Sequence, residues 1–311
     1  MPTSRSLPRN VSFYDATHLD VALGGFVQNG SITEANFLDI LRMLLIIEEG
    51  PIRVQQRVSG HIVSRTGVPL QTGVYDIYCD CMCYIPPIYS LVHLLILSAS
   101  IQVSNEPWIP RLISHEISGR ESSFRDGIRN RDRKCVISGT SIPEIHIQAN
   151  NWTTFEAPHI FPPEDKRLWI QYNYGRRITD MDDAIESSKL NSPQNGFLLR
   201  IEVHKMFDQY LISVNPDDGY KVVVFDTDLY GYDGRMLDPV CRKPDDPHCV
   251  SDKLLRWHFR QSVLANIRGA GEPIFEYDLP PRTGMESEIL ASLYPQERFG
   301  LEIAAGLVQV L

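Results

Sequence analysis

The spacing of hydrophobic positions changes several times along the chain, and each change indicates a different kind of secondary structure. Near the N-terminus the apolar side chains fall three or four residues apart, which is the spacing of a helix with one buried face: Phe37, Leu41, Leu44 and Leu45. Ser31-Ile32-Thr33-Glu34 has the spacing of a capping box that begins this helix, and Gly50-Pro51 ends it. Apolar and polar positions then alternate over 52–58, 61–63 and 73–78, which predicts strands. Residues 11–83 therefore predict a small mixed α/β unit.

The rest of the chain continues to switch between helical and extended patterns, with turn sequences between them. Asn215-Pro216-Asp217-Asp218-Gly219 is a strong turn signal and predicts a hairpin. Pro239 to Asp252 predicts a loop, and Ser251 or Asp252 can cap the helix that follows it. The predicted elements are helices over 88–98, 122–132, 196–209, 253–268, 285–294 and 296–309, and strands over 135–138, 153–160, 211–214 and 220–225.

This order of elements predicts an α+β protein in three parts. We expect an N-terminal α/β domain over 1–118 and a central domain over 119–240. Residues 241–311 then form a C-terminal helical extension that packs on the central domain.

Composition and charge narrow the function without naming it. The 311 residues are 43% hydrophobic and 22% charged, with a net charge of −9, which argues against a large surface that coats DNA regardless of sequence. The apolar run Ile85 to Ile101 is interrupted by prolines and polar residues and is shorter than a membrane span, so we expect no membrane association. The first ten residues lack a secretory pattern, which favours an intracellular protein of the nucleus or cytoplasm with mostly free thiols.

One short segment is basic within this acidic chain. Residues 120–134 hold six Arg or Lys against three acidic residues. A solvated helix face with ion pairs explains such a run, and a strip that contacts phosphates explains it as well. The candidates for nucleic-acid binding in the strip are Arg125, Arg129, Arg131, Arg133 and Lys134.

Candidate chemistry follows directly after this strip. Hydrolysis of a phosphodiester needs a base that activates water and a cation that neutralises developing charge, and a neutral imidazole with a divalent ion supplies both. His159 is predicted at the end of a strand, and His204 on a helix that follows. Asn195 lies nine residues before His204, half a turn out of phase within one helix, so we place it just before that helix as its cap. From there its amide could tie the loop carrying His159 to the helix.

Four motifs in this order resemble the HNH nuclease family, with its ββα-metal fold, and above all its fungal and bacterial branch. They are Cys135-Val136-Ile137-Ser138-Gly139, Pro158-His159-Ile160-Phe161-Pro162, Asn195-Gly196-Phe197-Leu198-Leu199 and His204-Lys205-Met206-Phe207-Asp208. The resemblance covers about residues 122–240 and continues more loosely into the C-terminal helices. It implies a nuclease that acts on DNA with a divalent metal ion, Mg²⁺ or Mn²⁺ with Zn²⁺ as an alternative. It also implies that His159 is the general base, His204 a metal ligand, and Asn195 a loop-orienting or auxiliary group.

The chain departs from the family at one position. The residue before the base is usually a metal ligand, and here it is Pro158, which cannot bind a metal. Glu156 is the nearest carboxylate and the candidate second ligand, and Glu164 or Asp165 could serve if the chain folds back. Two hypotheses therefore stay open: a metal-dependent endonuclease, and a degenerate HNH-like module that binds a partner or nucleic acid without cutting. The sequence gives no oligomeric state.

Overall fold

The structure is a computed structural model, and it describes residues 3–47, 51–79, 101–109, 111, 119–180, 189–271 and 273–274. The predicted helices over 88–98, 285–294 and 296–309 lie outside these residues. Within the described ranges, no helix has the length and apolar character needed to cross a membrane. The mixture of helices and strands confirms the α+β class.

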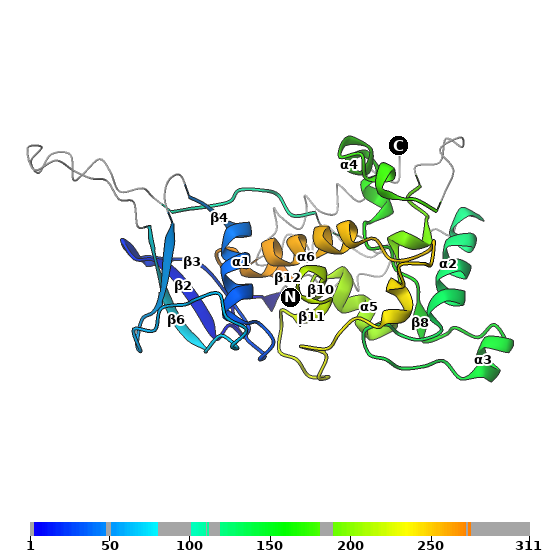
Figure 1. Cartoon of the computed structure of the whole chain (residues 1–311), viewed down its shortest axis with the longest axis horizontal. Helices are drawn as coiled ribbons and strands as arrows, with labels where there is room; N and C mark the ends of the chain where they lie inside the picture. The colour runs from blue at the N-terminus through cyan, green and yellow to red at the C-terminus, as the bar shows by residue number, and fades with distance from the viewer. Residues whose placement is uncertain are drawn as a thin grey trace, which may run out of the picture.

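The N-terminal unit is built on a four-stranded sheet of order β3-β2-β6-β5 (Figure 1). Its strands are β2 (Val11–Asp15), β3 (His18–Phe26), β5 (Ile52–Gln56) and β6 (Gly73–Cys79). β2 pairs antiparallel with β3 and parallel with β6, while β5 and β6 are antiparallel. Two small pairs flank this unit, β1 (Thr3–Ser4) with β12 (Pro273–Ile274) and β4 (Leu45–Ile46) with β7 (Gln102–Val103).

Helix α1 (Glu34–Leu44) covers this sheet and buries the predicted apolar stripe. Phe37 is fully buried and packs edge-on against Phe13 and Tyr75, which are both sheet residues. The capping box is formed by Thr33 and Asn36, so the prediction that it starts at Ser31 was two residues early. We call the buried cluster around Phe13, Phe37 and Tyr75 the sheet core.

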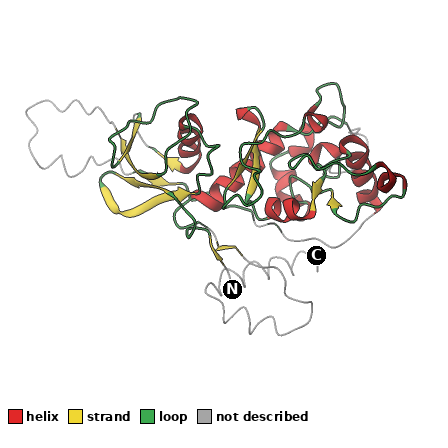
Figure 2. Cartoon of the chain, turned by 90° about the horizontal axis from the view of Figure 1, so that it is seen from below, coloured by secondary structure: helices red, strands yellow, loops and turns green. Residues whose placement is uncertain are grey.

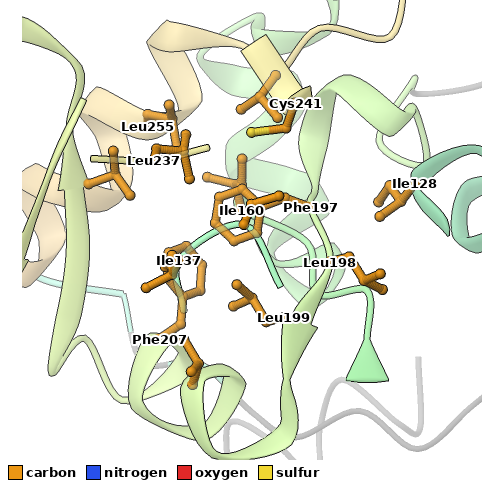
Figure 3. Close-up of a cluster of buried hydrophobic side chains, with 14 of the residues drawn as sticks. Ile128, Ile137, Ile160, Phe197, Leu198, Leu199, Phe207, Leu237, Cys241 and Leu255 are labelled. Carbon is orange, nitrogen blue, oxygen red and sulfur yellow. The ribbon is translucent and has the colours of Figure 1, made fainter. Parts of the chain in front are cut away.

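The central part of the chain is mostly helix and irregular structure around a second buried cluster. Its elements are α2 (Gly119–Asp132), α3 (Glu144–Gln148), β8 (Phe155–Glu156), α4 (Lys166–Gln171), β9 (Leu199–Arg200), α5 (Ile201–Asp208), β10 (Ile212–Asn215) and β11 (Lys221–Val224). Figure 3 shows the cluster, which we call the central core and which includes Ile137, Phe197, Leu199 and Phe207. The hairpin of β10 and β11 confirms the turn prediction at Asn215–Gly219.

Three sequence predictions in this region were wrong. Residues 135–138 form a turn, not a strand, although Val136 N–H still donates to the carbonyl of Leu198 across 3.0 Å. The strand over 153–160 shortens to β8, because the chain bends on both sides of it. The helix expected from Gly196 begins at Ile201, because residues 197–200 form a buried extended stretch that ends in β9.

Helix α6 (Asp252–Ile267) joins the two cores. Its first half contributes Leu254, Leu255 and Trp257 to the central core. Its second half contributes Phe259, Val263, Leu264 and Ile267 to the sheet core. Figures 1 and 2 show α6 running from the sheet unit into the group of helices around the central core. Each fully buried aliphatic side chain stabilises the fold by roughly 1.5–3 kcal/mol, so both cores depend on this helix.

Candidate active site

Two short strands and the helix behind them form the frame of the site. β8 pairs antiparallel with β9, with Phe155 opposite Arg200 and Glu156 opposite Leu199. α5 follows β9 without a connecting loop. His159 lies three residues after β8 and forms a further antiparallel bridge with Gly196. The frame therefore brings the loop with His159 and the helix with His204 onto one strand pair.

His159 is held by its backbone and by its ring. The imidazole stacks on Phe124 of α2, with ring centres 3.9 Å apart and planes 2° from parallel. Its Nε2 lies 2.9 Å from Asn191 Oδ1. An amide oxygen can only accept a hydrogen bond, so Nε2 carries the proton and Nδ1 keeps its lone pair. Burial lowers the pKa of His159 to about 4, so this imidazole is neutral at pH 7.

Asn195 ties the loop of His159 to the segment before β9. Its side chain is fully buried, accepts a hydrogen bond from Phe161 N–H (2.8 Å), and donates to the carbonyls of Phe161 (3.1 Å) and Leu190 (2.9 Å). It lies in a 3₁₀ turn, Pro193–Asn195, and not at the start of α5, so the predicted helix cap was wrong. All three hydrogen bonds go to backbone groups, which makes Asn195 a structural brace for the loop.

Gly196 explains why a glycine follows this asparagine. A Cβ at this position would lie 2.6 Å from the Phe124 ring and 2.7 Å from the carbonyl oxygen of Pro158. The backbone itself is extended, so the requirement is for space and not for an unusual φ angle. Any larger residue would push the His159 loop away from the strand pair.

His204 lies between two carboxylates. Its Nδ1 is 2.5 Å from Glu156 Oε2, and its Nε2 is 2.8 Å from Asp208 Oδ2, one helical turn further along α5. Burial lowers the pKa of His204, but the hydrogen bonds and charges of Asp208 and Glu156 outweigh this effect and raise it to about 9. The hydrogen bond from His204 in turn lowers the pKa of Glu156. At pH 7 the group is therefore an imidazolium between two carboxylate ions.

A comparison with known protein families identifies two segments of the chain. Residues 135–215 match the model of the HNH endonuclease family. This segment is an HNH endonuclease domain. Residues 8–83, which hold most of the sheet unit, match a family described as a domain of unknown function. No curated protein and no solved structure matches the chain.

The HNH domain offers a donor set of the right chemistry for a divalent ion. In the described part of the chain, no three His, Cys, Asp or Glu side chains are arranged as a ready metal centre. Glu156, His204 and Asp208 are instead closed on one another by protons on both imidazole nitrogens. Carboxylate oxygens and a neutral imidazole are the ligands that Mg²⁺, Mn²⁺ and Zn²⁺ take, and loss of one proton would free such a set. The residues therefore fit a divalent ion in chemistry.

Of the three candidate carboxylates, Glu156 is the one that contacts His204, and Asp208 contacts the same ring from α5. Glu164 and Asp165 lie in a separate 3₁₀ turn, where burial raises the pKa of Asp165 to about 6. Pro158 is buried in front of His159 and contributes no ligand.

Arg131 does not belong to an exposed basic strip. Its side chain is 2% exposed and forms an ion pair of 2.6 Å with the buried Asp132. Its guanidinium also donates to three backbone carbonyls, those of Pro193, Gly196 and His248. The sequence grouped Arg131 with surface arginines because α2 is polar on most sides, but its side chain is buried and braces the backbone at Pro193 and Gly196.

The other four basic residues lie partly or largely at the surface. Arg133 is half exposed and only 4.0 Å from Glu144, a loose ion pair. Lys134 donates to Asp238 at 2.9 Å. Arg129 lies 4.8 Å above the ring of Trp152, and Arg125 is partly buried on the same helix. These four side chains remain the candidates for phosphate contacts.

Three site residues were missed by sequence reasoning. Asp208 could have been predicted, because it lies four residues after His204 on the same helix face. Asn191, which orients the His159 ring, lies in a polar excursion without a motif. Arg111 donates to the carbonyls of His159 and Ile160 from well outside the matched segment, and no local pattern points to it.

Proposed function

We propose that the protein is a divalent-metal-dependent endonuclease that hydrolyses phosphodiester bonds of DNA, with His159 as general base and with His204 and Glu156 as metal ligands. One observation carries the proposal. A neutral imidazole whose Nδ1 has no hydrogen-bond partner among the described residues lies in the same ββα frame as an imidazole that two carboxylates hold at both nitrogens. The HNH endonuclease match supports a nuclease-type function for this frame.

His159 is prepared to accept a proton. The bond from Nε2 to Asn191 fixes the tautomer, and the stack on Phe124 fixes the plane of the ring. Nδ1 then takes the proton of the attacking water. Its low pKa keeps the lone pair available at pH 7, although a base this weak contributes less driving force than one that titrates near 7.

His204 and Glu156 would hold the ion on the Nδ1 side of the His204 ring. The pair already lies at hydrogen-bond distance, so the His204 proton is what the ion replaces. Asp208 keeps its bond to Nε2–H and thereby fixes the ring, as carboxylates behind metal-binding histidines commonly do. A bound divalent ion supplies neutralising charge for the phosphate and the leaving oxygen.

Contacts to the DNA backbone would come from the surface cations next to the domain. Four cations lie on α2 or just after it: Arg125, Arg129, Arg133 and Lys134. They are close in sequence to Phe124, on which the His159 ring stacks. With a net charge of −9, the chain binds DNA through this local group and not through its whole surface. Binding should therefore be weak and sensitive to salt.

The test is nicking of supercoiled plasmid by the purified chain with Mg²⁺, Mn²⁺ or Zn²⁺. Cleavage should require the metal and fall by at least about a hundredfold in His159→Ala, since a general base contributes roughly 10²–10⁴-fold. His146→Ala is the matched control, because His146 is exposed on α3 and belongs to no part of the site. Absence of cleavage by the wild type with every metal would remove the proposal.

A second function rests on Pro158. A proline in the usual ligand position suits an HNH-like module that binds nucleic acid or a protein partner without cutting. Pro158→Asp separates the two functions. If only the ligand is missing, the variant gains metal binding and nicking that the wild type lacks. Tight, stoichiometric metal binding by the wild type would count against the degenerate module.

A further inference from the structure

Residues 101–109 connect the sheet unit to the HNH domain along α6. They begin at β7 in the sheet unit and then run beside α6 toward the central core (Figure 1). Ile109 N–H donates to Gln261 Oε1 of α6 at 2.7 Å, and the Ile109 carbonyl accepts from Tyr210 O–H at 2.8 Å. Trp108 packs edge-on against the Tyr210 ring. The segment is therefore fixed on both sides just before Arg111.

Arg111 lies two residues after this segment and outside the matched residues 135–215. Its side chain is 5% exposed. Nη1 donates to the Ile160 carbonyl at 2.7 Å, and Nη2 donates to the His159 carbonyl at 2.5 Å. Nη2 also lies 2.9 Å from Asp208 Oδ1, and the guanidinium lies 5.3 Å from the centre of the Phe207 ring.

These contacts link the two halves of the site through one rigid group. Two consecutive carbonyls belong to the loop that carries His159. The carboxylate belongs to Asp208, which holds Nε2 of His204. A planar guanidinium presents its N–H groups in a fixed fork, so it sets the distance between loop and helix in a way that a flexible ammonium group does not.

We propose that Arg111 is a positioning residue that holds the His159 loop and the Asp208–His204 pair in register, and that the HNH site is therefore completed by a side chain from outside the HNH domain. The expected effect of Arg111 on catalysis rests on the proposed nuclease function. The contacts by which Arg111 links the loop to α5 do not depend on that function.

The charge of Arg111 distinguishes positioning from metal recruitment. A cation beside the His204 group opposes the binding of a second cation there. Removal of this charge should leave metal affinity unchanged or make it tighter. Misplacement of the base loop by about 1 Å should lower kcat by on the order of a hundredfold. A residue needed merely for folding would lower metal binding, kcat and thermal stability together.

The experiment compares the full-length wild type with Arg111→Met and Arg111→Lys. Methionine keeps the length of the side chain without donors, and lysine keeps the charge without the fork. Plasmid nicking with Mn²⁺ gives kcat and KM, and electron paramagnetic resonance of free Mn²⁺ gives the metal affinity. Hydrogen exchange measured by mass spectrometry reports the loop 157–163 and the end of α5.

Arg260→Met is the matched control. Arg260 pairs with Glu106 at 38% exposure for each side chain, so it fastens the same connecting segment to α6 but contacts neither His159 nor Asp208. If loosening of the segment were enough, this variant would show the same defects. We expect wild-type kcat and wild-type exchange of the loop 157–163.

The expected result is a kcat loss of on the order of a hundredfold in Arg111→Met and a clear loss in Arg111→Lys, since one fixed orientation is what the site requires. KM for DNA and Mn²⁺ affinity should not weaken, and exchange in the loop and at the end of α5 should accelerate together. Unchanged exchange in Arg111→Met, or a parallel loss of Mn²⁺ binding and thermal stability, would overturn the proposal. A wild type that never cleaves refutes the proposed function, while the exchange data still decide whether Arg111 clamps the two elements.

Discussion

Replacement of Asn195 by alanine should destabilise the HNH domain far more than the loss of one polar side chain suggests. The amide of Asn195 satisfies three backbone groups: Phe161 N–H, the Phe161 carbonyl and the Leu190 carbonyl. Alanine leaves all three without this partner at a position with no exposed surface. A small side chain also leaves a void beside the central core.

The magnitude follows from the cost of buried polar groups. Each buried donor or acceptor left unpaired costs about 1–3 kcal/mol. Three such groups set the upper end of the cost, and local relaxation reduces it. We expect the free energy of unfolding to fall by at least about 3 kcal/mol. Asn195→Asp should be as harmful as alanine. Its carboxylate can still accept from Phe161 N–H, but it has no N–H for the two carbonyls and faces them with a negative charge.

Urea unfolding followed by tryptophan fluorescence measures this loss, because Trp169 and Trp257 report on the central core. Asn191→Ala is the matched control. Asn191 makes one hydrogen bond to His159 and is partly exposed, so water can replace it and the loss should stay below about 1 kcal/mol. Asn191→Ala should nevertheless lower cleavage, since the His159 ring loses its tautomer partner. An Asn195→Ala protein within about 0.5 kcal/mol of wild type would refute the reasoning, because three unpaired buried groups cannot cost so little.

Three further predictions follow from the same geometry. His204 keeps its proton to about pH 9 in the fold, against 6.5 in an unfolded chain. Its ion pairs should therefore stabilise the metal-free protein fully below pH 6.5, and this stabilisation should be lost as the pH rises through 9. Urea unfolding of the wild type and His204→Gln at several pH values measures the difference in stability. A difference that grows with pH would contradict the prediction. Mn²⁺ affinity, measured by electron paramagnetic resonance, should rise by up to about tenfold per pH unit below pH 9, because the ion displaces the His204 proton; a flat profile would argue against His204 as ligand. A chain truncated after Val250 should lose its cooperative thermal transition, since α6 supplies Leu254, Leu255 and Trp257 to the central core, and a retained transition would show that this core is complete without α6.

The predictable parts of the fold are those with local causes. The hairpin of β10 and β11 follows from the turn Asn215–Gly219, and α6 begins after Ser251 and ends before Gly269, as its flanking residues indicate. The run after Asn195 was misread because Phe197, Leu198 and Leu199 are all apolar, and a short apolar run suits a buried helix as well as a buried strand. Tertiary pairing of β9 with β8 decides between them, and the sequence does not contain that information.

The candidate site likewise contains residues that the sequence could predict and residues that it could not. His159, Asn195 and His204 could be predicted as site residues because they lie in ordered motifs, and Glu156 because it was the nearest carboxylate to Pro158. The partners that complete the site come from far along the chain. Asn191 lies 32 residues after His159, and Arg111 lies 48 residues before it, on a segment directed by α6. The Asn191 contact depends on how a loop folds inside the HNH domain, and the Arg111 contact depends on how the preceding segment packs beside α6. No local pattern encodes either contact.

The place of Glu156 bears directly on the two functional hypotheses. Glu156 is the last residue of β8 and lies two residues before position 158 in the sequence. Its carboxylate lies 2.5 Å from Nδ1 of His204, the imidazole that a ligand at position 158 would serve. If Glu156 is the ligand, Glu156→Gln alone should abolish Mn²⁺ binding, and Pro158→Asp should restore it in that background while adding little to the wild type. If the module is degenerate, Glu156→Gln changes nothing, and Pro158→Asp creates binding by itself. The double variant separates a ligand that has moved by two residues from a ligand that is missing.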